Sequence, residues 1–218
     1  MNSQFKEFTQ PEARALPVIV LADISGSMAS GGKIDALNQA VRDMLAAFDN
    51  ADDLRAEIHV AVITFGGSAR LHVPLQQASR IRWTDMSANG GTPMGAAMSL
   101  AADLIEDRNQ IPSRAYRPTI VLVSDGAPTD DLQAGFDRLT KQGRASKAHR
   151  MAMAIGADAD TDMMRAFLPA AGELFVTADA RRIADFFEFV TMSTTTRTRA
   201  VDPNDIPKMQ SPFDLNEL

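Results

Sequence analysis

Residues 16–27 read LPVIVLADISGS, and this stretch decides the fold that we expect. Its first part, Leu16 to Ala22, is a continuous apolar run rich in β-branched residues, which is typical of a strand buried on both faces. The run ends at Asp23 and passes into a Ser/Gly turn. Ligands of open α/β sheets bind where the strands end, so this carboxylate marks a candidate site.

The rest of the chain alternates between strand-like and helix-like segments. Strand-like segments occur at 16–24, 56–66, 69–75, 118–126, 148–157 and 172–178. Helical spacing of apolar residues occurs at 34–48, 93–105, 132–139, 163–168 and 183–190. This alternation predicts an α/β fold with a doubly wound, mostly parallel six-stranded sheet and helices on both faces. Pro74 lies inside 69–75 and favours a short edge strand there, for which an antiparallel direction is one of the two possibilities.

The folded pattern covers only part of the chain. We expect an N-terminal extension at 1–14, one domain at 15–192 and a C-terminal tail at 193–218. The tail is rich in Thr, Pro and Asp, so it is interpreted as extended or disordered. Its scattered apolar side chains leave open a second interpretation, packing against the domain or a partner; they are Ile206, Met209, Phe213 and Leu215.

Composition excludes several classes of protein. The 218 residues include no cysteine, which rules out disulfides, zinc–thiolate sites and cysteine nucleophiles. Acidic residues outnumber basic ones by 28 to 22, which argues against non-specific nucleic-acid binding. The sequence has neither an apolar run long enough to span a membrane nor a signal-peptide core. We therefore expect a cytoplasmic protein with no nucleic-acid or membrane partner.

Three polar loops are expected to meet at one edge of the sheet. The first strand ends in DISGS (23–27), the fourth in SDG (124–126), and GGTPMG (90–95) precedes a helix. Strands one and four lie side by side in a doubly wound order, so their loops converge. The loops carry oxygen donors only, which suit a hard cation such as Mg²⁺, or Mn²⁺ or Ca²⁺. The candidate ligands are Asp23, Ser25, Ser27, Thr92 and Asp125.

The charge of this set indicates an incomplete coordination sphere. Two carboxylates at most neutralise a divalent ion, and five side chains rarely complete an octahedron. A position is then open to water or to a carboxylate from a partner protein.

The same loops carry a resemblance to a known family. DISGS at 23–27, GGTPMG at 90–95 and VSDGAPTD at 123–130 resemble the three metal-site loops of von Willebrand factor type A domains. The resemblance covers about residues 15–192 and matches in order and spacing. In that family the site is called a metal-ion-dependent adhesion site, abbreviated MIDAS. The resemblance implies divalent-cation-dependent protein binding and no catalysis.

The resemblance also implies a role for each candidate ligand. Ser25 and Ser27 would contact the metal directly. Thr92 would do so in the ligand-engaged state, and Asp23 and Asp125 would act directly or through water. A change of ligation would shift the Thr92 loop and the last helix between two states.

Two loop sequences narrow the resemblance further. GGTPMG and SDGAPTD are similar to the compact bacterial TerY-type proteins linked to tellurium resistance and chemical stress. The resemblance implies a cytoplasmic adaptor that acts beside a protein kinase or a PP2C-type phosphatase. The partner would supply an acidic side chain to the metal. Neighbouring loops at 66–70 and 127–131 would supply specificity.

An enzyme is the main alternative. Aspartate-nucleophile phosphatases also place an Asp after the first strand and use Mg²⁺, so Asp23 is a candidate nucleophile. Their second Asp, the acid/base two positions on, is replaced here by Ser25, and no late lysine is well placed.

Two other features have open interpretations. Asp158, Asp160 and Asp162 suggest either a second cation site or, as we favour, helix capping. Trp83 either packs in the core or flanks the metal face as a binding anchor.

Overall fold

A single six-stranded sheet runs through the part of the chain that the computed structural model describes, residues 13–51, 56–170 and 172–205. The strands are β1 (Arg14–Asp23), β2 (Ala56–Gly66), β3 (Ser68–Gln77), β4 (Thr119–Ser124), β5 (His149–Ile155) and β6 (Leu174–Thr177). Their order across the sheet is β3-β2-β1-β4-β5-β6, and every neighbouring pair is parallel except β2 and β3. The doubly wound, mostly parallel sheet expected from the sequence is confirmed.

The centre of the sheet brings the polar loops together. β1 pairs with β4 in parallel, so that Val18 to Ala22 lie beside Thr119 to Val123. All of these residues are buried, as the continuous apolar runs predict. The two strands therefore end at the same edge, where Asp23 and Ser124 are their last residues.

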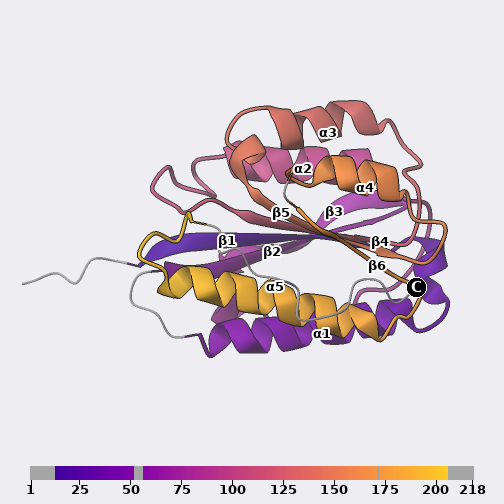
Figure 1. Ribbon diagram of the computed structural model, residues 1–218, viewed down its shortest axis with the longest axis horizontal. Helices are drawn as coiled ribbons and strands as arrows, with labels where there is room; N and C mark the ends of the chain where they lie inside the picture. Colours follow the sequence, from indigo (N-terminus) through magenta and orange to yellow (C-terminus); the bar gives the residue numbers. More distant parts are fainter. Residues whose placement is uncertain (1–12, 52–55, 171, 206–218) are drawn as a thin grey trace, which may run out of the picture.

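Helices cover both faces of the sheet (Figure 1). The α-helices are α1 (Lys33–Asp49), α2 (Met94–Glu106), α3 (Leu132–Lys141), α4 (Thr161–Phe167) and α5 (Arg182–Arg199). Short 3₁₀ turns occur at η1 (Gly26–Ala29), η2 (Ala78–Arg80) and η3 (Ala145–Lys147). Figure 1 shows α1 and α5 on one side of the sheet and α2, α3 and α4 on the other. Each layer buries its own apolar core against the strands between them.

The strand that contains Pro74, β3, lies at the edge of the sheet as expected and is antiparallel, but with 10 residues it is not short. It pairs with β2 through a tight turn at Gly67, whose φ of 68° is a left-handed conformation that favours glycine. Pro74 lies exposed within β3, where its missing N–H breaks no inner ladder bond.

The expected tail boundary at Ser193 is wrong, because α5 continues to Arg199. Thr194 and Thr198 are buried, and Arg197 is fully buried with its guanidinium donating to the Pro203 carbonyl at 2.9 Å and to Thr119 Oγ1 at 2.7 Å. Helical spacing was hidden because the buried side of this last segment is polar. Of the expected tail, residues 206–218 lie outside the described residues, as do residues 1–12 of the expected extension.

None of the helices in the described ranges has both the length and the apolarity needed to cross a membrane.

Candidate metal centre

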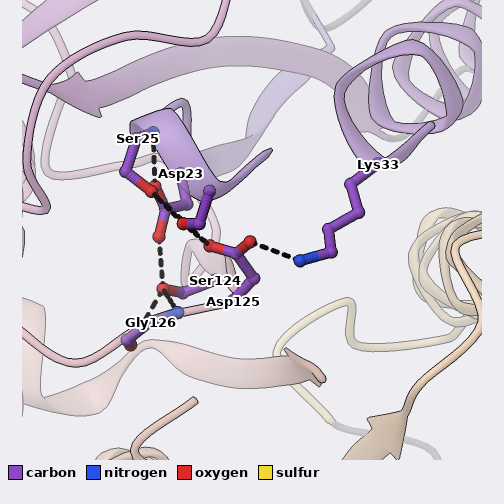
Figure 2. Close-up of polar contacts among 7 residues, drawn as sticks. Asp23, Ser25, Lys33, Ser124, Asp125 and Gly126 are labelled. Atoms are coloured by element: carbon purple, nitrogen blue, oxygen red, sulfur yellow. Dashed lines mark hydrogen bonds and ion pairs between the residues drawn. The ribbon is translucent and has the colours of Figure 1, made fainter. Parts of the chain in front are cut away.

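Asp23 is the innermost group of the site. It ends β1 and is fully buried, and both of its carboxylate oxygens accept hydrogen bonds (Figure 2). Oδ1 accepts the Ser25 backbone N–H at 2.7 Å, and Oδ2 accepts the Ser124 hydroxyl. Burial raises the pKa of Asp23, the hydrogen bonds from Ser124 and Ser25 oppose this rise, and the nearby charge of Asp125 adds to it.

Asp125 brings the two serines of the first loop together. Its Oδ1 accepts the Ser27 hydroxyl at 2.7 Å and lies 3.5 Å from the Ser25 hydroxyl. The two hydroxyl oxygens are 3.0 Å apart. Asp125 and Ser25 are buried, whereas Ser27 is exposed. The serine and aspartate oxygens predicted from the sequence therefore gather at one point, with a path to solvent past Ser27.

Thr92 lies in the third loop, which is bonded directly to the other two. The Gly26 N–H donates to the Gly90 carbonyl at 2.9 Å, which joins the loop after β1 to the Thr92 loop. On the other side, Thr92 and Thr129 are linked by two hydrogen bonds, of 2.9 and 3.0 Å. The buried Thr92 hydroxyl lies 3.5 Å from the position that a Cβ on Gly126 would occupy. All five predicted residues thus lie on three loops in mutual contact.

Close packing of two loops depends on glycine at Gly90. This residue has a φ of 70°, and a Cβ there would lie 2.5 Å from Gly67 Cα. The Gly67 N–H also donates to the Gly91 carbonyl at 3.1 Å. The turn between β2 and β3 therefore supports the Thr92 loop, and only glycine allows the approach.

Asp130 is a residue whose role the sequence analysis missed. Its two carboxylate oxygens accept the backbone N–H groups of Gly95 and Ala96, at 3.0 and 2.8 Å. These are free donors in the first turn of α2, which begins directly after Thr92 and Pro93. The loop after β4 thereby fixes the start of the helix that follows Thr92. The VSDGAPTD motif contains Asp130, but only the fold shows which helix it caps.

Lys33 is the second group that was missed. Its Nζ lies 2.7 Å from Asp125 Oδ2, on the side of the carboxylate opposite the serine hydroxyls (Figure 2). Lys33 is the first residue of α1 and belongs to none of the three motifs.

The donor set suits a hard divalent cation. It offers two buried carboxylates and three hydroxyls without nitrogen or sulfur, and hard cations prefer such oxygen ligands. The fit rests on the Ser25, Ser27 and Asp125 oxygens, which already lie within 2.7 to 3.5 Å of one another.

The other candidates from the sequence have structural roles. Asp160 caps α4 by accepting the Met163 N–H at 3.0 Å, and within the described ranges no three His, Cys, Asp or Glu residues form a metal-binding cluster. The capping interpretation is confirmed for Asp160. Trp83 is half-buried against the core on the α1 side and donates to Asp85 at 3.0 Å.

Known proteins resemble the chain in sequence and fold. The 60 kDa subunit of magnesium chelatase from Rhodobacter capsulatus is 32% identical over 175 residues, which are 77% of this chain and 29% of that protein. A mussel byssus protein, proximal thread matrix protein 1 with a zinc-occupied MIDAS motif, superposes with a TM-score of 0.59 at 15% identity, over 83% of this chain and 45% of that chain. The manganese-loaded TRAP protein of Plasmodium vivax gives a TM-score of 0.52 at 18% identity, over 80% and 72% of the two chains.

The matched region is only a part of each curated relative. The chain spans between 12% and 29% of the length of the curated relatives it matches. Residues 18–127, which include all five candidate ligands, match the model of one family. With the sheet order and the three loops described above, this match shows that the chain belongs to the von Willebrand factor type A domain family.

Proposed function

We propose that this domain binds a protein partner through a divalent cation held by Asp23, Ser25, Ser27, Thr92 and Asp125. The observation that carries the proposal is the contact between the hydroxyls of Ser25 and Ser27 and the buried Asp125 carboxylate. Three loops far apart in sequence deliver these oxygens to one edge of the sheet, where α/β proteins bind their ligands. The metal-loaded mussel and Plasmodium proteins share this fold, which supports a cation at this place.

The cation would supply an electrophilic centre for an oxygen ligand from outside. Asp23 and Asp125 offer two negative charges and the hydroxyls offer none, so protein groups at most neutralise a divalent ion. Ser27, the exposed member of the set, marks the side that is open to solvent. An acidic side chain of the partner fits this position, with Mg²⁺ as the proposed ion and Mn²⁺ or Ca²⁺ as substitutes.

Binding is favoured over catalysis by the surroundings of Asp23. A phosphatase nucleophile must reach its substrate, but Asp23 is fully buried and both its oxygens accept hydrogen bonds. Ser25 stands where such enzymes keep an acid/base, and its hydroxyl is engaged with Ser27 and Asp125.

The cellular role that we propose is an adaptor in a bacterial response to tellurite or chemical stress. This proposal is supported by the similarity of the loop sequences GGTPMG and SDGAPTD to those of TerY-type proteins. The partner is then a protein kinase or a PP2C-type phosphatase of the same cytoplasmic system, which presents an Asp or Glu side chain.

Calorimetric titration with Mg²⁺ and Mn²⁺ tests the metal site. Asp23→Asn removes one charge from the site, so we expect affinity to fall at least about tenfold. Asp43→Asn is the matched control, because it removes one charge from an exposed position of α1. Equal affinity in wild type and Asp23→Asn contradicts the proposal.

A pull-down from bacterial lysate tests the partner. Capture of a kinase or phosphatase that persists in Mg²⁺ and disappears in EDTA is the expected result. Capture that is indifferent to EDTA contradicts a cation-dependent partner.

A further inference from the structure

Lys33 places a positive charge beside the candidate metal ligands. Its Nζ lies 2.7 Å from Asp125 Oδ2, while Asp125 Oδ1 faces the hydroxyls of Ser27 and Ser25. The Asp125 carboxylate is thus shared between neutral hydroxyl donors and one positively charged ammonium group (Figure 2). One oxygen points to the serine hydroxyls, and the other is held by the ammonium group.

The local backbone directs Lys33 to this place. Gly31 and Gly32 precede it with φ values of 66° and 72°, a left-handed conformation that other residues rarely adopt. The glycine pair forms the turn between η1 and α1, and the first residue of α1 contacts the loop after β4.

Lys33 is more exposed to solvent than the carboxylate with which it pairs. Its side chain is 21% exposed, whereas that of Asp125 is 0% exposed. A lysine side chain is flexible, and its three N–H donors can form hydrogen bonds in many geometries. The ammonium group therefore has freedom to exchange Asp125 for an acceptor that arrives from solvent.

The positive charge of Lys33 affects which ligands the metal-loaded site would attract. Asp23, Asp125 and Lys33 sum to one negative charge when all are ionised. A divalent cation brings the sum to one positive charge, whereas without Lys33 it would be zero. The loaded site would then attract an anion, and a carboxylate has two oxygens to place.

We propose that Lys33 is a second binding residue for the acidic ligand. We also propose that Lys33 weakens metal binding when no acidic ligand is bound. This inference rests on the proposed function. The ammonium group pairs with Asp125 and opposes an incoming cation through like charge. With a divalent cation held by Asp125, Lys33 would be available to donate to the second oxygen of the ligand's carboxylate. Lys33 thus selects carboxylate ligands over neutral oxygen ligands.

Lys33→Gln separates the two effects because they have opposite signs. We expect Mg²⁺ and Mn²⁺ affinity, measured by calorimetry, to rise roughly 3- to 10-fold. The ligand probe is a blocked pentapeptide with one central glutamate, titrated at saturating Mg²⁺ and followed by NMR. We expect its affinity to fall roughly fivefold, and the preference for this peptide over the same peptide with glutamine in place of glutamate to shrink.

Lys141→Gln is the matched control. The side chain of Lys141 is 62% exposed on α3 and pairs with Asp137. The substitution therefore removes the same charge at a position away from the site. This variant is expected to match wild type in both titrations. Lys33→Arg is expected to keep most of the peptide affinity, since the positive charge remains.

The outcomes distinguish this inference from the proposed function. If Asp23→Asn weakens metal binding but Lys33→Gln changes neither affinity, the inference fails and the metal site stands. If Lys33→Gln weakens both metal and peptide, Lys33 only supports the loop structure and the inference also fails. If wild type binds metal no better than Asp23→Asn, both proposals fall.

Discussion

Ser27 is the exposed member of a candidate ligand set whose other four residues are buried. Its hydroxyl donates to Asp125 at 2.7 Å and lies 3.0 Å from the Ser25 hydroxyl. Its partner Asp125 is buried, so removing the Ser27 hydroxyl takes one hydrogen bond from a buried carboxylate. Because Ser27 itself is exposed, its substitution leaves no buried cavity, and the effect on folding is limited to that one hydrogen bond.

Ser27→Ala is expected to weaken Mg²⁺ binding about tenfold or more, because it removes one of five candidate ligands. The free energy of unfolding in EDTA should fall by only about 1 kcal/mol, because Lys33 still pairs with Asp125. Calorimetry and urea denaturation measure the two quantities. Unchanged metal affinity would remove Ser27 from the ligand set.

At the residue scale, the sequence predicted the motif residues and missed their supports. The sequence singles out five candidate ligands because each sits in a short motif at a strand end or a helix start: Asp23, Ser25, Ser27, Thr92 and Asp125. Lys33 and Asp130 were missed for a physical reason. Their roles depend on contacts with residues 92 and 35 positions away, which no local pattern encodes.

At the element scale, the start of α2 depends on the loop after β4. Asp130 accepts the N–H groups of Gly95 and Ala96, and Thr129 is bonded to Thr92 on the same loop. A carboxylate at a helix N-terminus satisfies free donors and interacts favourably with the helix dipole. Asp130 therefore fixes both the helix and the position of Thr92.

Asp130→Ala is expected to lower the free energy of unfolding by about 1 kcal/mol and to weaken Mg²⁺ binding. The neighbouring Asp131→Ala is the matched control, because Asp131 caps α3 by accepting the Gln133 N–H at 3.1 Å. It should lose similar stability but keep its metal affinity. Equal metal affinity in the two variants would show that the cap on α2 does not position Thr92.

The end of α5 shows where element prediction failed. Apolar residues mark its first half, but from Ser193 on the buried side consists of Ser, Thr and Arg. Arg197 is accommodated there by the Arg117 and Pro203 carbonyls and the Thr119 hydroxyl. Such a polar buried face has no helical hydrophobic period, so the sequence was interpreted as a tail.

At the scale of the whole molecule, the two ends of the parallel strands carry different polar groups. The edge where β1 and β4 end holds the candidate metal site, and the edge where β4 and β5 begin holds Arg197 and His149. Burial lowers the pKa of His149 to about 4, with smaller contributions from the charges of Arg197 and Arg150. Its Nδ1 atom is buried and has no hydrogen-bond partner.

His149 makes stability depend on pH. An unfolded histidine binds its proton near pH 6.5, so between pH 6.5 and 4 the unfolded state holds more protons than the folded state. The contribution of His149 is therefore complete above pH 6.5 and is lost as pH falls to 4. Its maximum is about 3 kcal/mol.

His149→Gln tests this dependence. Urea denaturation of wild type in EDTA should give a free energy of unfolding that falls steadily between pH 6.5 and 4. The variant should show a smaller fall across the same range, since it lacks the titrating ring. Parallel profiles for the two proteins would contradict a buried neutral His149.

The overall topology was predictable because each central strand is a continuous apolar run and each run alternates with an amphipathic helix. Pro74 likewise marked the antiparallel edge strand. Gly67 and Gly90 packing against each other was not predictable, because the close approach joins two loops that lack a shared pattern.

Anomalous diffraction from a crystal of the wild-type domain soaked in Mn²⁺ tests the central claim most directly. The account predicts one strong peak among the oxygens of Ser25, Ser27, Thr92 and the two aspartates, with Ser25 and Ser27 at direct coordination distance. Absence of a peak there, or a peak only at other carboxylates, would contradict it.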